Sequence, residues 1–163
     1  MQIETARFGQ INIDENSIIT FPDGLPGFEE KRRFAFVSHP SANQDKSSPF
    51  LWLQSLEDEK LAFLTAEPRH FFPGYAPRIA NADLDALEIG AAPLGPRLYT
   101  LLTVPTGDPI GITANLLAPI AINPVAHIAR QVIVAGDDYG LRHRLLPAEE
   151  STAPQAREAV AAG

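Results

Sequence analysis

The densest apolar stretch of the sequence is Gly111-Ile-Thr-Ala-Asn-Leu-Leu-Ala-Pro-Ile-Ala-Ile-Asn123. Segments rich in β-branched and aromatic residues flank it on both sides, at residues 98–104 and 128–134. Runs of this kind, separated by Pro, Gly and Asn, are typical of strands. We therefore expect consecutive strands in which the flanking segments pair with the apolar stretch and form the core of the protein.

A proline interrupts this stretch. Pro119 has no N–H group and cannot donate to the ladder of a central strand, so we interpret the stretch as two short strands that meet at a bend. Asn115 ends the first of these short strands, and Asn123 ends the second. Because an unpaired buried amide costs about 1–3 kcal/mol, we expect these side chains to form hydrogen bonds with the backbone at the bend.

Short strand patterns also occupy most of the remaining chain. They alternate apolar with polar residues or concentrate aromatic ones, and turns separate them at Gly9, at residues 14–16 and at the polar residues 57–60. The last of these strand patterns, residues 141–145, is basic. The strands expected outside the central stretch are residues 3–8, 10–13, 17–21, 34–37, 50–56, 61–65 and 141–145.

The loop Phe21-Pro-Asp-Gly-Leu-Pro-Gly-Phe28 contains two prolines and two glycines. Proline fixes φ and glycine permits a positive φ, so this composition predicts a defined turn rather than a floppy segment. Phe21, Leu25 and Phe28 are spaced so that they can attach the loop to the core.

Two segments predict short helices. Residues 68–75 combine prolines with aromatic residues, which suggests one helical turn followed by a loop. Residues 81–87 are the better candidate, because Asn81 can act as N-cap, acidic residues occupy the first turn, and Leu84 and Leu87 lie on one face.

The length of 163 residues fits one domain with a substantial hydrophobic core. Roughly ten candidate strands and little helix indicate an all-β or mostly β fold, a small barrel or sandwich with one or two short helices. Residues 39–49 predict an exposed loop. We assign residues 1–146 to the β domain and the Ala-rich residues 147–163 to a tail that is disordered in isolation.

Composition excludes several classes of function. The chain has no cysteine, which removes disulfides, thiolate zinc sites and cysteine nucleophiles and suits a reducing compartment such as the cytoplasm. We expect neither a signal peptide nor a membrane span. The formal net charge of -7 argues against direct binding to nucleic acid and suits a basic protein partner.

The sequence contains no recognisable catalytic or nucleotide-binding motif. His127 and His143, with Asp137 and Asp138 between them, could serve a metal-dependent hydrolase, but an acidic pair of this kind is more often a turn. A structural module of a larger assembly is a further alternative. The aromatic group of Phe71, Phe72 and Tyr75 is more often a core plug beneath a loop than a pocket. We expect no enzyme, no metal and no cofactor.

Several segments, taken in their order and spacing, carry a family resemblance. They are Phe21-Pro-Asp-Gly-Leu-Pro-Gly-Phe-Glu29, Pro49-Phe-Leu-Trp-Leu-Gln-Ser-Leu56 with Leu61-Ala-Phe63, Phe71-Phe-Pro-Gly-Tyr75, Leu102-Thr-Val-Pro105, residues 112–123, Gln131-Val-Ile133, and Tyr139 with Arg142-His143. Together they resemble the flagellar assembly factor FliW family. The resemblance extends over nearly the whole chain, to about residue 146.

This resemblance implies a small cytoplasmic β-barrel-like protein, expected to be a monomer, that acts by binding and not by catalysis. The family's partners are flagellin, held before export as by a chaperone, and CsrA, a dimeric RNA-binding repressor of flagellin translation. When flagellin leaves the cell, the freed factor binds CsrA away from its RNA surface and inhibits it allosterically. The net acidity of this chain suits such a basic partner.

The chain departs from the family pattern at the long loop 39–49, at the tail after Pro147, and at Pro73-Gly-Tyr75, where the family more usually has Pro-Asp-Tyr. The family motif does not itself identify partner contacts. As a hypothesis we therefore select acidic residues that are predicted to be exposed near the motif segments. They are Asp23, Glu29, Glu30, Glu57, Asp58, Glu59 and Glu67.

Overall fold

The computed structural model describes residues 1–38, 49–89, 95–107 and 111–145. The expected loop 39–49 and the tail 147–163 therefore lie outside the described residues, apart from Pro49. The described secondary structure is mostly β, with a 3₁₀ turn and two short α-helices. In chain order the elements are β1 (Gln2–Thr5), β2 (Gly9–Asn12), η1 (Glu15–Ser17), β3 (Ile19–Thr20), β4 (Arg33–Val37), β5 (Phe50–Ser55), β6 (Ala62–Ala66), α1 (Pro68–Phe71), α2 (Asn81–Ala86), β7 (Arg97–Thr103), β8 (Thr113–Ala114), β9 (Ile120–Asn123), β10 (Ile128–Gln131) and β11 (His143–Arg144).

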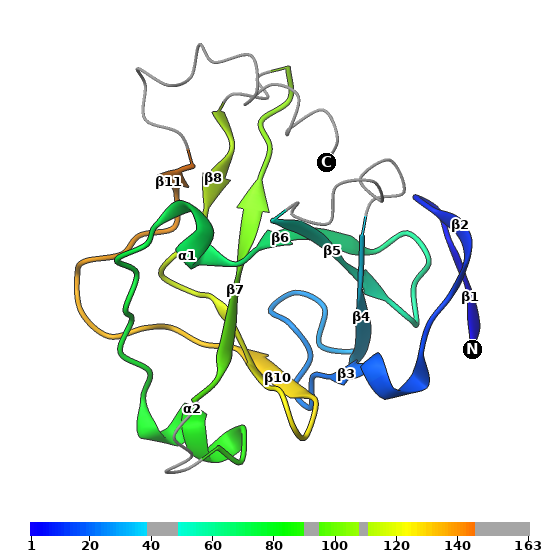
Figure 1. Ribbon diagram of the computed structural model, residues 1–163, viewed down its shortest axis with the longest axis horizontal. Helices are drawn as coiled ribbons and strands as arrows, with labels where there is room; N and C mark the ends of the chain where they lie inside the picture. The colour runs from blue at the N-terminus through cyan, green and yellow to red at the C-terminus, as the bar shows by residue number, and fades with distance from the viewer. Residues whose placement is uncertain (39–48, 90–94, 108–110, 146–163) are drawn as a thin grey trace.

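Seven strands close into a barrel. Each is hydrogen-bonded to the next in the order β7, β6, β5, β4, β3, β10, β9, and β9 pairs back with β7, so the ring has no free edge. Figure 1 shows this ring in the middle of the molecule, with β8 and β11 continuing from one end of β7 and the β1–β2 hairpin beside the ring. The expected mostly β, barrel-like fold is confirmed.

The bend predicted at Pro119 makes this closure possible. The stretch divides into β8 and β9, and β7 pairs with both: Leu102 with Ala114 in β8, and Tyr99 with Ile120 in β9. The asparagine side chains bond to backbone as expected, because Asn115 Oδ1 accepts from Ala118 N–H at 2.9 Å. Asn123 also bonds to backbone, but not at the bend as predicted: its Nδ2 donates to the carbonyl of Leu87 at 2.8 Å, and its Oδ1 accepts from Val125 and Ala126 in the β9–β10 turn.

The loop after β3 plugs one end of the barrel. Phe21 and Leu25 are almost fully buried and belong to the barrel core, which also contains Phe34, Leu53 and Ile120. Figure 1 shows this blue loop lying across the ring of strands. Burying one Leu or Phe side chain contributes about 1.5–3 kcal/mol, so the attachment of the loop through Phe21 and Leu25 accounts for its defined shape. The prediction for Phe28 is wrong: its side chain is 40% exposed, and its ring meets only the edge of the barrel at Phe63, 5.5 Å away between centroids.

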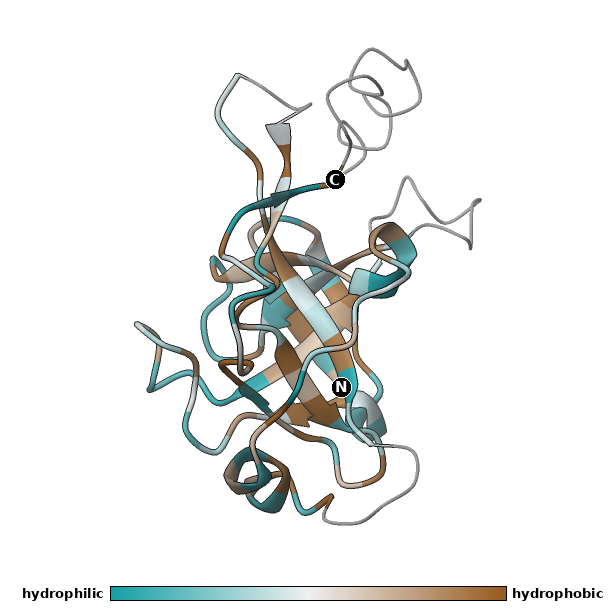
Figure 2. Cartoon of the chain, turned by 90° about the vertical axis from the view of Figure 1, so that its left-hand side faces the viewer, coloured by the Kyte–Doolittle hydropathy of each residue, from teal (hydrophilic) through white to brown (hydrophobic). Residues whose placement is uncertain are grey.

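Two smaller clusters cover the outside of the barrel. One surrounds Tyr75, whose hydroxyl donates to the carbonyl of Leu116 at 2.7 Å, and Phe71 and Phe72 pack against it. The prediction that these aromatic residues fill the core is confirmed. The other cluster joins Leu87, after α2, to β9 and β10. Figure 2 shows hydrophobic residues concentrated in the strands and hydrophilic residues on peripheral loops.

The predicted position of the turn between the first two strands is wrong. Sequence reasoning places the break at Gly9, whereas the turn comprises residues 6–8 and Gly9 begins β2. The cause is Thr5, whose hydroxyl accepts from the N–H of Phe8 and donates to the carbonyl of Gly9, both at 2.8 Å. The hairpin packs on the barrel through this turn, because the guanidinium of Arg7 lies 3.9 Å from the ring centroid of Trp52.

Other predicted boundaries are also corrected. Ser17 is in η1 rather than in a strand, because Asp14 caps that turn by accepting from the N–H of Asn16. Asn81 is the first helical residue of α2, and the N-cap is Ala80, which has no side-chain acceptor. The predicted strands 128–134 and 141–145 are shorter than expected, as β10 and β11.

Gly24 should be essential to the plug. Its φ is +66°, and a Cβ there would lie 2.5 Å from the Cα of Glu29, so an alanine both strains the backbone and displaces the loop. We expect Gly24→Ala to lower the free energy of unfolding in a urea titration by about 3 kcal/mol or more.

Gly27→Ala is the matched control. Gly27 also has a positive φ, of +85°, but a Cβ at this position would have no atom within 4 Å. We expect a loss of about 1 kcal/mol, the conformational cost alone. Equal losses in the two variants would contradict the close packing of the plug.

Candidate functional site

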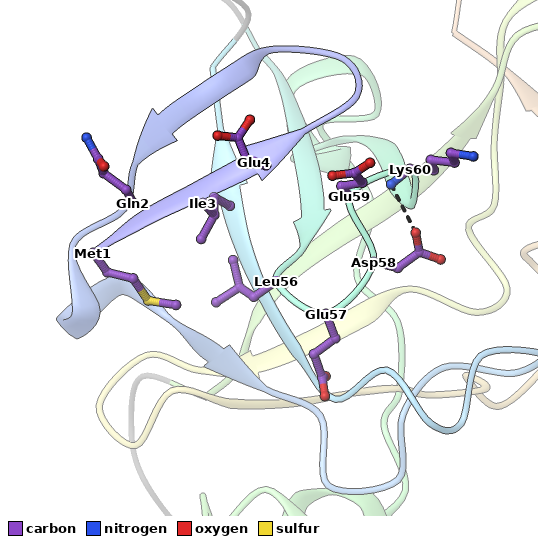
Figure 3. Close-up of a pocket in the computed structure, with 9 residues that line it drawn as sticks. All are labelled: Met1, Gln2, Ile3, Glu4, Leu56, Glu57, Asp58, Glu59 and Lys60. Atoms are coloured by element: carbon purple, nitrogen blue, oxygen red, sulfur yellow. Dashed lines mark hydrogen bonds between the residues drawn. The ribbon is translucent and has the colours of Figure 1, made fainter.

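A hollow of about 650 Å³ lies between β1 and the turn from β5 to β6. Figure 3 shows its composition: the side chains of Ile3 and Leu56 point toward one another, Met1 lies to one side of them, and the charged residues Glu4, Glu59 and Lys60 also line the hollow. The backbone holds the two segments together, because the N–H of Ala6 donates to the carbonyl of Glu59 at 2.9 Å. The hollow therefore combines a few apolar side chains with a charged lining in which acidic residues outnumber the one lysine, Lys60.

Glu57, a predicted contact residue, has a structural role. Its Oε1 accepts from the backbone N–H groups of Arg32 at 2.6 Å and Arg33 at 2.9 Å, which fixes the start of β4. Figure 3 shows this carboxylate turned away from Glu59. The hydrogen bonds from Arg33 and then Arg32 lower the pKa of Glu57 below its ordinary value of 4.5.

The other predicted contact residues differ in how far they are engaged. Glu29 accepts from the N–H of Gly27 at 2.6 Å, and Asp58 accepts from that of Lys60 at 3.0 Å. Exposed ion pairs join Asp23 to Arg130 at 3.6 Å and Glu67 to Arg97 at 3.2 Å. Within the described part of the chain, the carboxylates of Glu30 and Glu59 form no hydrogen bond or ion pair, so these two are free for a partner.

The predicted residues do not form one surface. Glu57, Asp58 and Glu59 share the β5–β6 turn at the plugged end of the barrel, and Asp23, Glu29 and Glu30 belong to the plug loop. Glu67 follows β6, whose strand runs away from that turn, so it lies at the opposite end.

The two histidines considered for a metal site, His127 and His143, lie in the β9–β10 turn and in β11. His143 Nε2 accepts from the N–H of Gly140 at 2.6 Å, and the backbone of His127 has a φ of +56°. In the segments that the structure describes, no group of three or more His, Asp or Glu side chains could hold a metal ion.

Sequence reasoning missed the contribution of the N-terminus to the hollow. Met1, Ile3 and Glu4 line it together with residues 56–60, more than fifty positions later in the chain. Ile3 offered a signal, because an apolar residue in a short amphipathic strand needs a surface to cover. Nothing local indicated that this surface would be Leu56.

The fold and the hollow define a class: a small closed β-barrel with a hollow at its plugged end that combines apolar and acidic side chains. Comparison with known proteins identifies the family. The family model described as "FliW protein" matches residues 2–145, and the chain belongs to the FliW family. Its curated relatives are named flagellar assembly factors.

Individual relatives match over almost their whole length. The flagellar assembly factor FliW of Moorella thermoacetica is 38% identical over 145 residues, 89% of this chain and 88% of that protein. The FliW of Heliobacterium modesticaldum is 39% identical over 152 residues, 93% and 95% of the two chains. A crystal structure of the flagellar assembly factor FliW superposes with a TM-score of 0.78 at 35% identity, covering 91% of this chain and 99% of the other.

No helix in the described residues is long and apolar enough to cross a membrane.

Glu57→Gln tests the structural role of this carboxylate. Because the folded pKa of Glu57 lies below the unfolded one, its charge stabilises the fold above the ordinary carboxyl pKa, and this contribution is lost as pH falls through the lowered folded pKa. We expect Glu57→Gln to lower the free energy of unfolding by about 1 kcal/mol at pH 7, measured by urea titration.

The loss should shrink as the pH falls below the ordinary carboxyl pKa and vanish once it has passed the lowered folded pKa of Glu57, where the wild-type carboxyl is neutral too. Glu59→Gln is the control, with little effect at either pH, since Glu59 accepts no such bonds. A Glu57→Gln loss that stayed constant with pH would exclude a charge-dependent role.

Proposed function

We propose that this chain is a non-catalytic binding protein that holds flagellin before export and, once flagellin has left the cell, binds and antagonises the repressor CsrA. The observation that carries this proposal is membership of the FliW family over residues 2–145. The acidic side chains of the hollow support it, because Glu4 and Glu59 attract a partner of net positive charge and need no contact with its RNA surface, which leaves the antagonism allosteric.

The composition of the hollow suits recognition of a protein. Stable interfaces combine an apolar centre, which supplies most of the affinity, with a polar rim that sets orientation and association rate. Met1, Ile3 and Leu56 would supply the apolar centre of such an interface. Glu4, Asp58 and Glu59 would supply its polar rim. The net charge of -7 strengthens the attraction of a basic partner at long range.

A competition experiment tests the partner switch. The purified full chain is immobilised, and flagellin monomer and CsrA are applied separately and then together, with binding followed by interferometry. We expect each protein to bind alone and flagellin to displace CsrA. Failure of both to bind at micromolar concentration would overturn the function, and simultaneous binding of both would overturn the competition.

A charge-reversal pair tests the acidic hollow. Glu4→Lys with Glu59→Lys should reduce the association rate of CsrA about tenfold at low salt, and the reduction should nearly vanish near 0.5 M salt, where the Debye length is roughly 4 Å. Asp85→Lys with Asp137→Lys is the matched control. It makes the same change in net charge at exposed acids that do not line the hollow.

Equal reductions in the two double variants would mean that net charge alone steers the partner, and the hollow would not be the CsrA surface. A thermal melt of each variant shows that the fold is retained.

A further inference from the structure

The two ends of the barrel differ. The plug loop fills one end with Leu25, which is 2% exposed and belongs to the barrel core. At the opposite end, where β4, β6 and β9 finish and β3, β7 and β10 begin, the structure contains a cavity of about 280 Å³. The mouth of a small β-barrel is a recurrent place for small ligands.

The inner walls of this cavity are apolar. Ile19, Phe36, Tyr99 and Ile122 line it, and all four belong to the barrel core or pack against it. The rings of Phe36 and Tyr99 lie 4.5 Å apart between centroids, at an interplanar angle of 37°. Residues of the barrel core and residues packed against it therefore form the inner wall of the cavity.

The outer part of the cavity offers hydrogen-bond donors. Asn16, Ser17, Arg97 and His127 line it, although the hydroxyl of Ser17 already donates to the carbonyl of Asp14 at 2.7 Å. No Asp or Glu lines the cavity, although the chain carries a net charge of -7. The guanidinium of Arg97 uses Nη2 in an exposed ion pair with Glu67, which leaves its other N–H groups available. The absence of an acid among the lining residues favours an anion over a cation.

Tyr99 adds a donor nearer the centre. Tyr75 donates its hydroxyl to Leu116, and Tyr139 accepts from the N–H of Ala76. The third tyrosine, Tyr99, has no hydroxyl hydrogen bond to any described residue, although it is only 6% exposed. Burial raises the pKa of Tyr99, so its phenol remains a neutral donor at physiological pH.

We propose that the open mouth of the barrel is a binding site for an apolar group that ends in a carboxylate. The apolar group would pack against Phe36 and Ile122, and the carboxylate would accept hydrogen bonds from Tyr99 and Arg97. The volume limits the apolar part to about the size of one aromatic or branched side chain, since the whole cavity is only about 280 Å³. This site is distinct from the acidic hollow, and it goes beyond the proposed partner switch.

The test is a titration of the isotope-labelled full chain with hydrocinnamate, followed by amide chemical shifts. We expect saturable shifts at Phe36, Tyr99, Ile122 and His127, with a dissociation constant in the millimolar range or tighter, as for a ligand of about 11 heavy atoms. The neutral hydrocinnamide should bind at least about tenfold more weakly, because it cannot form charge-assisted hydrogen bonds.

Two variants separate the cation from its ion pair. Arg97→Gln and Glu67→Gln both break the Arg97–Glu67 pair, but only the first removes the guanidinium. We expect Arg97→Gln to weaken hydrocinnamate binding about tenfold, and Glu67→Gln to leave it unchanged or tighter. Tyr99→Phe keeps the ring against Phe36 and should weaken binding about threefold or more. Arg97 and Glu67 are exposed, so the variants are expected to fold.

The source of the carboxylate is distinguished by a second ligand, the peptide acetyl-Gly-Gly-Phe with a free carboxyl terminus. Tighter binding of this peptide than of hydrocinnamate indicates a protein chain end, and binding of hydrocinnamate alone indicates a free small acid. The proposal is overturned if neither ligand shifts these amides at about 10 mM, well above the range expected from ligand size. It is also overturned if hydrocinnamide binds as tightly as the acid, or if Arg97→Gln and Glu67→Gln change the affinity equally.

Discussion

The pairing of β7 with β9 is the constraint on which the rest of the structure depends. Through Arg97 with Ile122, Leu98 with Ala121, and Tyr99 with Ile120, it joins the two ends of a sheet that would otherwise present two open edges. The pairing requires β7 to be long enough to contact two successive strands, and it requires the next segment to turn away after β8. β7 is seven residues long, which is enough to pair with both strands, and the chain turns away after β8 at the bend at Pro119.

Closure also determines where binding surfaces can lie. The side chains inside the ring form one packed core, so a hollow that reaches core residues can open only at an end of the barrel. At one end the plug loop, the β5–β6 turn and the N-terminal hairpin produce the acidic hollow. At the other, the core remains accessible between η1 and the β9–β10 turn. Because both are built on a hydrogen-bonded frame, neither needs to be ordered on binding, which lowers the entropic cost of association.

Local chemistry made part of this structure predictable. A proline inside an apolar run, an asparagine beside it, and a Pro- and Gly-rich loop each allow few conformations. The bend, the hydrogen bond of Asn115 and the burial of Phe21 and Leu25 agree with the predictions. The cap of α2 was mispredicted because Asn81 is one residue too late, and the helix begins without a side-chain cap at all.

The sites were less accessible to sequence reasoning because they depend on tertiary proximity. The acidic character of Glu57, Asp58 and Glu59 predicted their exposure on a turn, but the composition could not show that Glu57 is committed to the backbone of Arg32 and Arg33. Nor could it show that Ile3 meets Leu56. The cavity at the open end draws its lining from several separate segments, with no motif that joins them.

Native-state hydrogen exchange, read amide by amide, tests the closure of the barrel most directly. If the ring is closed, the hydrogen-bonded amides of residues 97–99 and 120–122 exchange only through global unfolding, whereas those of the two-residue strands β8 and β11 exchange through local opening. Exchange at residues 97–99 and 120–122 that is as fast as in β8 and β11 would show instead that the ring is open in solution.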